Sequence, residues 1–490
     1  MKIAVFTQLP AFLNDIGDVI RLFYGEGAAV FPESDADAQL FHEHVDAGEC
    51  WRECFLLRTG GMERRIEKSA PAVRGGLEEK RQLKRLVKNT AYALLKDFTG
   101  RKPAWGSLTG IRPTRLFYQQ LAAGCTPEEA EKRLIDLFDI SEEKVKLLRE
   151  ITEAQKGFLD RDPGRCDLYI GIPFCTTRCS YCSFSSGEIG NGRLVEPYLN
   201  SLIAELRAAR ELSEKYGFKI HTGYIGGGTP TSLSAKQLDR LLDEVCRLFP
   251  GLTEWTVEAG RPDTLDEEKL RVLRSYPVTR ISINPQTMND ETLRRIGRAH
   301  TAADTVHAYE RARTLGFSDI NMDIIAALPG EDLPLFEKTL AGAWLLRPES
   351  LTVHTLAVKR SSRLHEQRYQ QGGEEAAAMV ESARETAHAM GMRAYYMYRQ
   401  KYMADNLENA GYCLDGHVCR YNIDNMEETT SILACGAGAI SKLVPGEGEK
   451  IVRVPNLSNI EQYIARVEEM IRRKRIAFGE GGENDVGHIG

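Results

Sequence analysis

Three cysteines lie close together in the chain, Cys175, Cys179 and Cys182, in the spacing CxxxCxxC. Thiolates are the side chains that iron–sulfur clusters and zinc take from proteins. Three of them on one short loop can bind three irons of a [4Fe–4S] cluster and leave the fourth iron open to a small molecule. A structural zinc site would need a fourth ligand nearby. We therefore expect a [4Fe–4S] cluster here, with zinc or unligated buried cysteines as the alternatives.

The cysteines follow the first of six short apolar runs that alternate with amphipathic stretches. The expected strands are Leu168–Ile172, Gly223–Ile225, Trp255–Glu258, Arg280–Asn284, Ile320–Ala326 and Leu351–Thr355. The expected helices are Val195–Tyr216, Ala235–Phe249, Asp266–Ser275, Ala302–Leu315 and Pro334–Leu345. Such alternation predicts an α/β fold of parallel βαβ units, as an open barrel or a doubly wound sheet. Both architectures gather ligands at the carboxyl ends of the strands.

The remaining chain predicts three further regions around this core, which we place at residues 163–358. Residues 1–162 are expected to form an α+β domain, with a helix over Leu77–Asp97 and a helix start at Thr126, where Glu129 completes a capping box. Residues 359–478 are expected to form a smaller α+β domain that covers the substrate, with helices near Glu374–Met390 and Ile460–Lys474. The Gly/Glu-rich segment 479–490 predicts disorder.

Composition limits the class of protein. The 490 residues carry a net charge of −6, which argues against a general nucleic-acid partner because such proteins are usually basic. No apolar run is long enough for a membrane span, and the N-terminus lacks the features of a signal peptide. We therefore expect a cytoplasmic protein whose clustered cysteines bind metal. Nothing in the sequence demands an oligomer, and we expect a monomer.

Polar residues recur where the expected strands end. Gly226-Gly227-Gly228-Thr229-Pro230 follows the second strand, and glycines let backbone amides approach a ligand. Glu258 ends the third strand, Gln286 and Arg298 follow the fourth, and Asp323 lies on the fifth. Each residue alone has an ordinary structural alternative, but together they predict one shared pocket.

The segment Tyr169-Ile170-Gly171-Ile172-Pro173-Phe174, followed by the cysteine triplet, resembles the radical S-adenosylmethionine (SAM) superfamily. The resemblance implies a partial (β/α)6 barrel in which the open iron binds the amino and carboxylate groups of SAM. It also implies that the reduced cluster cleaves SAM to methionine and a 5′-deoxyadenosyl radical, which abstracts a hydrogen atom.

Within that superfamily the chain is most similar to the oxygen-independent coproporphyrinogen III oxidase family, in its HemZ-like branch. The N-terminal segment Trp105-Gly106-Ser107-Leu108-Thr109-Gly110-Ile111-Arg112-Pro113 also resembles that branch. The resemblance implies contacts to the cluster-bound SAM from Tyr169, Gly227 and Glu258. It implies contacts to a second SAM from Tyr181, Gly228, Thr229, Gln286, Arg298, Asp323 and Ala357, and a further SAM-pocket residue at Ile440.

The reaction implied is oxidative decarboxylation of two propionates of coproporphyrinogen III to give protoporphyrinogen IX in heme biosynthesis, with electrons from an unidentified donor. A substrate with four carboxylates needs basic groups, and arginine forks suit carboxylates well. The candidates are Lys359, Arg360, Arg363, Arg399 and Lys401, with exposed surface charges as the alternative.

Two positions differ from the decarboxylases, and they keep other functions open. Phe184 stands where those enzymes have a fourth cysteine, and Gly171 stands where they have histidine. The related heme chaperones also lack the fourth cysteine, but their C-terminal histidine is replaced here by Tyr421. The alternatives are therefore a heme-binding trafficking protein that retains a SAM cluster, and a radical SAM enzyme acting on another tetrapyrrole.

Overall fold

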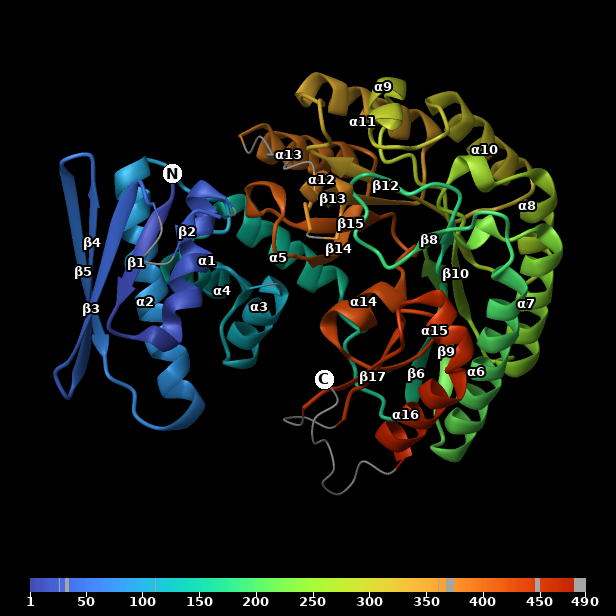
Figure 1. Ribbon diagram of the computed structural model, residues 1–490, viewed down its shortest axis with the longest axis horizontal. Helices are drawn as coiled ribbons and strands as arrows, with labels where there is room; N and C mark the ends of the chain where they lie inside the picture. Colours follow the sequence, from blue (N-terminus) through green and yellow to red (C-terminus); the bar gives the residue numbers. More distant parts are fainter. Residues whose placement is uncertain are drawn as a thin grey trace. The chain divides into compact units, whose positions relative to one another are not determined.

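The computed structural model describes residues 1–25, 27–30, 35–110, 112–359, 361–366, 374–445 and 450–479. The chain divides into two compact units (Figure 1). Unit 1 comprises Met1–Arg149 and Arg399–Glu408, and unit 2 comprises Glu150–Tyr398 and the chain from Asn409 onward. Arg360 and the predicted disordered segment, apart from Gly479, lie outside the described residues. The domain boundaries expected at residues 162 and 358 stay a prediction.

Unit 1 has the α+β composition that the sequence indicates. Its sheet has the order β2-β1-β3-β4-β5, with β1 parallel to β2 and β3 and the remaining pairs antiparallel. The strands are β1 (Ile3–Thr7), β2 (Ala29–Val30), β3 (Ala38–Asp46), β4 (Cys50–Thr59) and β5 (Met62–Pro71). The helices are α1 (Leu13–Tyr24), α2 (Gly76–Thr99), α3 (Pro113–Ala122), α4 (Pro127–Phe138) and α5 (Glu142–Ala154), which runs across the boundary between the units.

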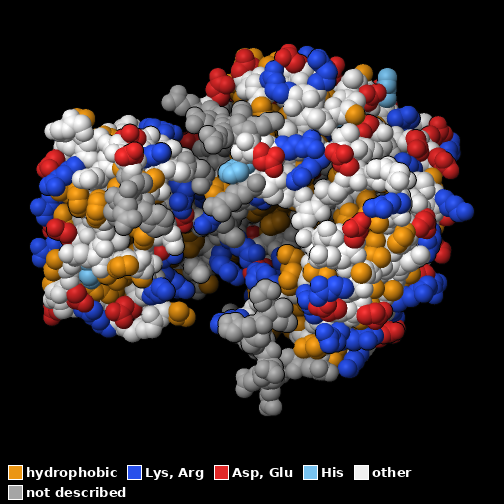
Figure 2. Space-filling view, in the orientation of Figure 1, with side chains coloured by type: hydrophobic (Ala, Val, Ile, Leu, Met, Phe, Trp, Pro, Cys, Tyr) orange, Lys and Arg blue, Asp and Glu red, His pale blue; other side chains and the backbone are white. Residues whose placement is uncertain are grey.

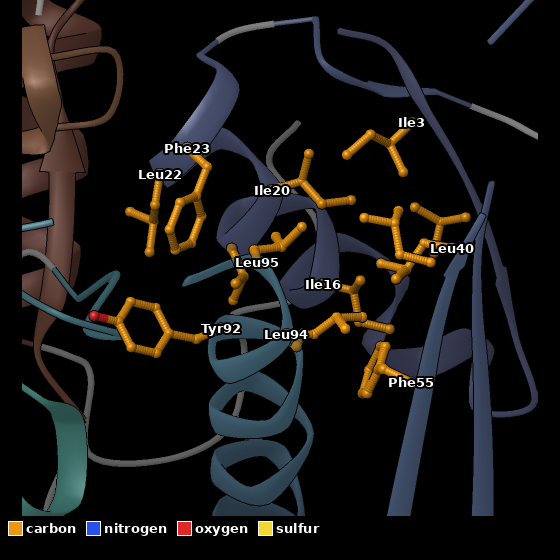
Figure 3. Packing of buried hydrophobic residues seen from close by; sticks show 14 of the residues in the cluster. Ile3, Ile16, Ile20, Leu22, Phe23, Leu40, Phe55, Tyr92, Leu94 and Leu95 are labelled. Atoms are coloured by element: carbon orange, nitrogen blue, oxygen red, sulfur yellow. The ribbon is translucent and has the colours of Figure 1, made fainter. Parts of the chain in front are cut away.

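The core of unit 1 lies between this sheet and helices α1 and α2. Figure 3 shows Ile16, Ile20 and Leu94 of these helices pointing toward Leu40 and Phe55 of the sheet, and all five are fully buried. The predicted capping box at the start of α4 is confirmed, because the Thr126 hydroxyl and the Glu129 carboxylate each accept the other residue's backbone N–H. Burial of the apolar side chains between the sheet and helices α1 and α2 stabilises unit 1.

Unit 2 is built around an 11-stranded sheet of order β14-β15-β13-β12-β11-β10-β9-β6-β16-β17-β18. Its centre consists of six parallel strands: β6 (Arg165–Ile172), β9 (Lys219–Gly227), β10 (Glu254–Glu258), β11 (Arg280–Ser282), β12 (Ile320–Ala326) and β13 (Ser350–Thr355). These match the six expected strands, and with their helices they form the partial barrel, so the predicted fold class is confirmed.

Helices connect the strands along the outer side of the barrel (Figure 1). They are α6 (Val195–Lys215), α7 (Ala235–Leu248), α8 (Glu267–Arg274), α9 (Asp290–Arg295), α10 (Ala302–Thr314) and α11 (Leu333–Leu346). Five of them begin at a side chain that accepts a backbone N–H of the first turn, namely Ser234, Asp266, Asn289, Thr301 and Asp332. These N-cap residues explain why the starts of the helices can be predicted from the sequence. On the face shown in Figure 2, acidic and basic side chains intermix.

The C-terminal part of the chain extends both edges of the same sheet. On one side β15 (Asn409–Cys413) pairs antiparallel with β13, and β14 (Arg393–Tyr398) pairs antiparallel with β15 at the edge of the sheet. On the other side β16 (Ser431–Cys435) runs parallel to β6, followed by β17 (Ile440–Leu443) and β18 (Val452–Pro455). The helices of this part are α12 (Arg363–Glu366), α13 (Glu374–Ala389), α14 (Arg420–Glu427), α15 (Ile460–Ala465) and α16 (Val467–Gly479). The single helix expected near Ile460–Lys474 is thus two helices.

A buried ion pair attaches this C-terminal part to the barrel. Glu205 on α6 is 1% exposed and pairs with Lys474 on α16. Its carboxylate also accepts the Tyr463 hydroxyl at 2.6 Å, the Asn456 amide at 2.8 Å and the Gly436 backbone N–H at 2.7 Å. Because every lone pair has a donor, the buried carboxylate is stabilised at the loop that follows β16.

Candidate functional site

The cysteine triplet lies on the loop after β6, at the carboxyl end of the parallel strands. A short strand pair, β7 (Phe174–Cys175) with β8 (Gly187–Glu188), closes this loop at its base. The loop is also hydrogen-bonded to residues 296 and 297. The Thr177 hydroxyl donates to the Gly297 carbonyl at 3.0 Å, and the Ser180 N–H donates to the Ile296 carbonyl at 2.9 Å. The three thiols are free cysteines, as cluster binding requires.

The glycine-rich segment after β9 packs directly against the first cysteine. A Cβ added to Gly228 would lie 2.6 Å from the Phe174 carbonyl oxygen and 3.0 Å from the Cys175 sulfur, so a side chain has no room there. Thr229 is 1% exposed and its hydroxyl donates to the Cys175 sulfur at 3.6 Å. Gly227 has a φ of 111°, which favours glycine. The backbone of this segment can therefore reach a ligand at the loop.

The donor set fits an iron–sulfur cluster better than zinc. Among the described residues, no group of three or more Cys, His, Asp or Glu side chains is arranged to hold a single metal ion. A mononuclear zinc site would need four such ligands converging on one point. A cube instead binds each thiolate at a different iron, so its ligands stand farther apart.

Glu258 is the carboxylate at the carboxyl end of β10. It accepts the Tyr224 hydroxyl at 2.6 Å, and the Tyr224 ring stacks near Tyr169 of the neighbouring strand, with centroids 6.3 Å apart. Burial raises the pKa of Glu258 to about 7, and the hydrogen bond from Tyr224 offsets only part of that effect. Burial also raises the pKa of Tyr169. Both groups can therefore donate as well as accept near neutral pH.

Three further predicted residues, Gln286, Arg298 and Asp323, lie together beside the fourth and fifth strands. Gln286 has a φ of 67°, and its backbone N–H donates to the Asp323 carbonyl at 3.0 Å. Its side-chain oxygen is buried and has no hydrogen-bond partner within the described residues. Arg298 donates to the Asn284 carbonyl at 2.6 Å and lies against Cys179 and Tyr181. A buried unpaired oxygen on a strained backbone is a sign of a ligand-binding position.

The other predicted residues differ in where they lie. Ala357 follows β13 and is half-buried, whereas Ile440 begins β17 and is 46% exposed. Lys359 is half-buried near Cys182, and burial lowers the pKa of its ammonium. Arg363 is half-exposed at the start of α12, 3.7 Å from the Glu188 carboxylate.

Arg399 and Lys401 belong to unit 1. The Arg399 guanidinium donates to the carbonyls of Leu108 at 2.9 Å, Gly110 at 3.2 Å and Asn406 at 2.8 Å. It also lies over the Trp105 ring at 5.1 Å, and burial lowers its pKa to about 10. Lys401 is exposed, and its ammonium lies 3.8 Å from Asp18. Arg399 thus holds the loop that the sequence singled out around Trp105, and a substrate role for it stays a prediction.

Sequence reasoning missed several residues that the structure places at the cysteine loop. Arg261 and Asp263 follow β10 in a turn and contact Thr176, Thr177 and Cys179. Their only sequence signal is that they come three to five residues after the strand end at Glu258. Tyr224, which lies two residues before the glycine run, could have been found because strand residues two apart share a face.

Comparison with known proteins agrees with this geometry. Residues 169–341 match the family model described as the radical SAM superfamily. The chain is 41% identical over 479 residues to the "oxygen-independent coproporphyrinogen-III oxidase-like protein HemZ" of Bacillus subtilis, which covers 93% of each chain. The chain belongs to the radical SAM superfamily, in its HemZ-like branch. A [4Fe–4S] cluster and SAM are therefore its cofactors.

Two other proteins similar to this radical SAM protein have different names, one a heme chaperone and one an oxidase. It is 39% identical over 194 residues to the "heme chaperone HemW" of Bacillus subtilis, covering 39% of this chain and 50% of that one. Its structure resembles that of the "coproporphyrinogen III oxidase (HemN)" of Escherichia coli, with a TM-score of 0.51, 21% identity, and coverage of 65% and 72%. The structural likeness supports the barrel fold. No described helix is long and apolar enough to cross a membrane.

Proposed function

We propose that this radical SAM protein oxidatively decarboxylates propionate side chains of coproporphyrinogen III. The likeness to HemZ over nearly the whole chain carries the proposal, because that relative is named for likeness to the oxygen-independent oxidase. When bound, the cluster and SAM supply a carbon-centred radical that abstracts a hydrogen atom. Loss of CO₂ and of one electron to an acceptor then converts each propionate to a vinyl group.

In this proposal the chain's own residues bind and orient the cofactor. Gly227, Gly228 and Thr229 offer backbone and hydroxyl groups beside Cys175. Glu258 and Gln286 provide the carboxyl and amide oxygens that can receive donors of SAM, since the Gln286 oxygen is buried without a partner among the described residues. Binding of SAM would complete these hydrogen bonds.

A propionate needs a cation near the cluster loop, and Lys359 is the best-placed candidate. Its ammonium is half-buried near Cys182, and burial lowers its pKa. A carboxylate that approaches it would stabilise its charged form, because an opposite charge favours ionisation. Arg363 at the start of α12 is a second candidate, although its guanidinium already lies 3.7 Å from Glu188.

The test is an anaerobic assay with reconstituted protein, SAM, a strong reductant and coproporphyrinogen III. We expect methionine, 5′-deoxyadenosine and the three- or two-propionate product, resolved by chromatography. Cys179→Ala should abolish all three, whereas Cys246→Ala, on the outer helix α7, should leave them unchanged. Formation of 5′-deoxyadenosine with untouched coproporphyrinogen would reject this substrate.

Heme trafficking is the second candidate, and the likeness to HemW favours it. Tyr421 is the residue that would have to bind ferric heme in place of the chaperone's histidine. However, its ring stacks on Tyr224 with centroids 4.7 Å apart, and burial raises the pKa of its phenol, which disfavours the ligating phenolate. Stoichiometric heme binding that Tyr421→Phe abolishes, without turnover of coproporphyrinogen, would favour this candidate over the first.

A further inference from the structure

Arg261 is a buried arginine that the proposed reaction does not use. It follows β10 and is 3% exposed. Asp263 holds one edge of its guanidinium, because Nε donates to Oδ1 and Nη2 donates to Oδ2, each at 3.0 Å. Two parallel hydrogen bonds of this kind fix both the position and the plane of a guanidinium.

The remaining nitrogen of Arg261 points into the cysteine loop. Nη1 donates to the Thr177 carbonyl and the Thr177 hydroxyl, each at 3.0 Å, and to the Cys179 sulfur at 3.9 Å. Asp263 in turn accepts the Thr176 hydroxyl at 3.1 Å. The pair therefore contacts two residues between the first two cluster cysteines, Thr176 and Thr177, and the sulfur of the second cysteine, Cys179.

A second buried side chain, that of His300, also lies close to the Asp263 carboxylate. His300 is 3% exposed, and its Nδ1 lies 3.5 Å from an Asp263 oxygen. Burial alone would raise the pKa of Asp263, but His300 and Arg261 together hold it well below its ordinary range. Asp263 is thus a fixed anion, and Arg261 is a fixed cation between that anion and Cys179.

We propose that Arg261 and Asp263 form a positioning pair that holds Cys179 and sets the reduction potential of the cluster. The potential of an iron–sulfur cluster depends on nearby charge and on hydrogen bonds to its sulfurs. Partners one step beyond the ligands also contribute to metal retention. Cys175 instead receives a neutral hydroxyl from Thr229. The inference requires the cluster alone and does not depend on the substrate.

The two members of the pair should affect the potential in opposite directions. Reduction adds a negative charge to the cluster, so a fixed cation favours it and a fixed anion opposes it. Arg261→Gln removes the cation and leaves Asp263, which lowers the midpoint potential. Asp263→Asn removes the anion and leaves Arg261, which raises it. The double variant should lie between them, and a loop that was merely loosened would not give opposite signs.

The experiment uses the full chain with its cluster reconstituted anaerobically, without SAM or tetrapyrrole. The midpoint potential of the cluster is measured by redox titration, in which electron paramagnetic resonance monitors the reduced cluster. Release of iron to a chelator should be on the order of 10-fold faster in Arg261→Gln. Arg271→Gln on α8 is the matched control, because this arginine is 66% exposed and pairs with Glu267. The control should match the unaltered protein in both measurements.

Opposite shifts with an unchanged control would support the pair. Shifts in the same direction, no shift in either variant, or an equal shift in Arg271→Gln would overturn it. If Arg261→Gln bound no iron, Asp263→Asn would decide, because a midpoint at or below that of the unaltered protein contradicts the proposal. If the coproporphyrinogen assay failed, the midpoint potentials and the iron release could still be measured and interpreted, because neither uses a tetrapyrrole.

Discussion

The pH dependence of folding offers a direct test of the site's electrostatics at Glu258. Burial raises the pKa of this carboxyl from its ordinary 4.5 to about 7. Each pKa unit is worth about 1.4 kcal/mol at 25 °C, so the full difference of about 2.5 units corresponds to about 3.5 kcal/mol. Because the side chain is only partly buried, we expect about 2 to 3 kcal/mol in the cluster-free protein.

Whether this carboxyl makes the folded state more or less stable as the pH rises depends on which state, folded or unfolded, binds the proton more tightly. The folded protein keeps Glu258 protonated up to about pH 7, whereas the unfolded chain releases the proton near 4.5. The contribution to stability is therefore fully present below pH 4.5 and is lost as the pH rises through 7. Glu258→Gln cannot ionise, so it should not share this loss.

The assay is urea denaturation of the cluster-free protein at pH 5 and pH 8, followed by tryptophan fluorescence. Trp255 is buried on the same strand as Glu258 and reports on it. From pH 5 to pH 8 the unaltered protein should lose about 2 to 3 kcal/mol relative to Glu258→Gln. Glu267→Gln, at a largely exposed glutamate on α8, should behave like the unaltered protein. Parallel pH profiles for Glu258→Gln and the unaltered protein would refute the reasoning.

Three further outcomes test other parts of the chain. Gly228→Ala would place a Cβ 3.0 Å from the Cys175 sulfur, so reconstituted protein should lack the visible absorbance of the cluster while keeping its far-ultraviolet circular dichroism; a normal iron content would contradict this. Glu205→Gln leaves the Lys474 ammonium buried without its carboxylate, which should cost about 3–5 kcal/mol in urea denaturation, and an unchanged midpoint would argue against the ion pair. Thr126→Ala removes a capping box and should cost about 1 kcal/mol in thermal unfolding, whereas Thr126→Ser should cost little.

The core of unit 2 was predictable because its signals are local. Each buried parallel strand is a short apolar run, and each helix start carries a capping side chain such as Ser234 or Thr301. The expected strand Ile320–Ala326 has the same bounds in the structure. The cysteine spacing and the polar residues at strand ends follow from the same regularity, since parallel strands end at one edge of the sheet.

Contacts between distant segments could not be predicted in this way. Arg261 and Asp263 lie in a turn without periodicity, and nothing in their local sequence indicates that they contact Cys179. Arg399 looked available for a carboxylate, but its guanidinium is bonded to backbone carbonyls of unit 1. Tyr421 stands where the related heme chaperones have a histidine, but its stacking on Tyr224 depends on tertiary packing and has no local sequence signal.

The pairing of β16 with β6 has a consequence for the order in which the protein matures. The strand that leads into the cysteine loop gains its second neighbour only from residues 431–435, and Thr430 bonds to the Arg165 carbonyl across a separation of 265 residues. On the ribosome, β6 is therefore synthesised long before the sheet around it can be completed. Long-range parallel pairing of this kind is slow to form. Iron delivered during translation would meet three cysteines on an unfinished sheet, so stable insertion of the cluster belongs after the last strands have been released.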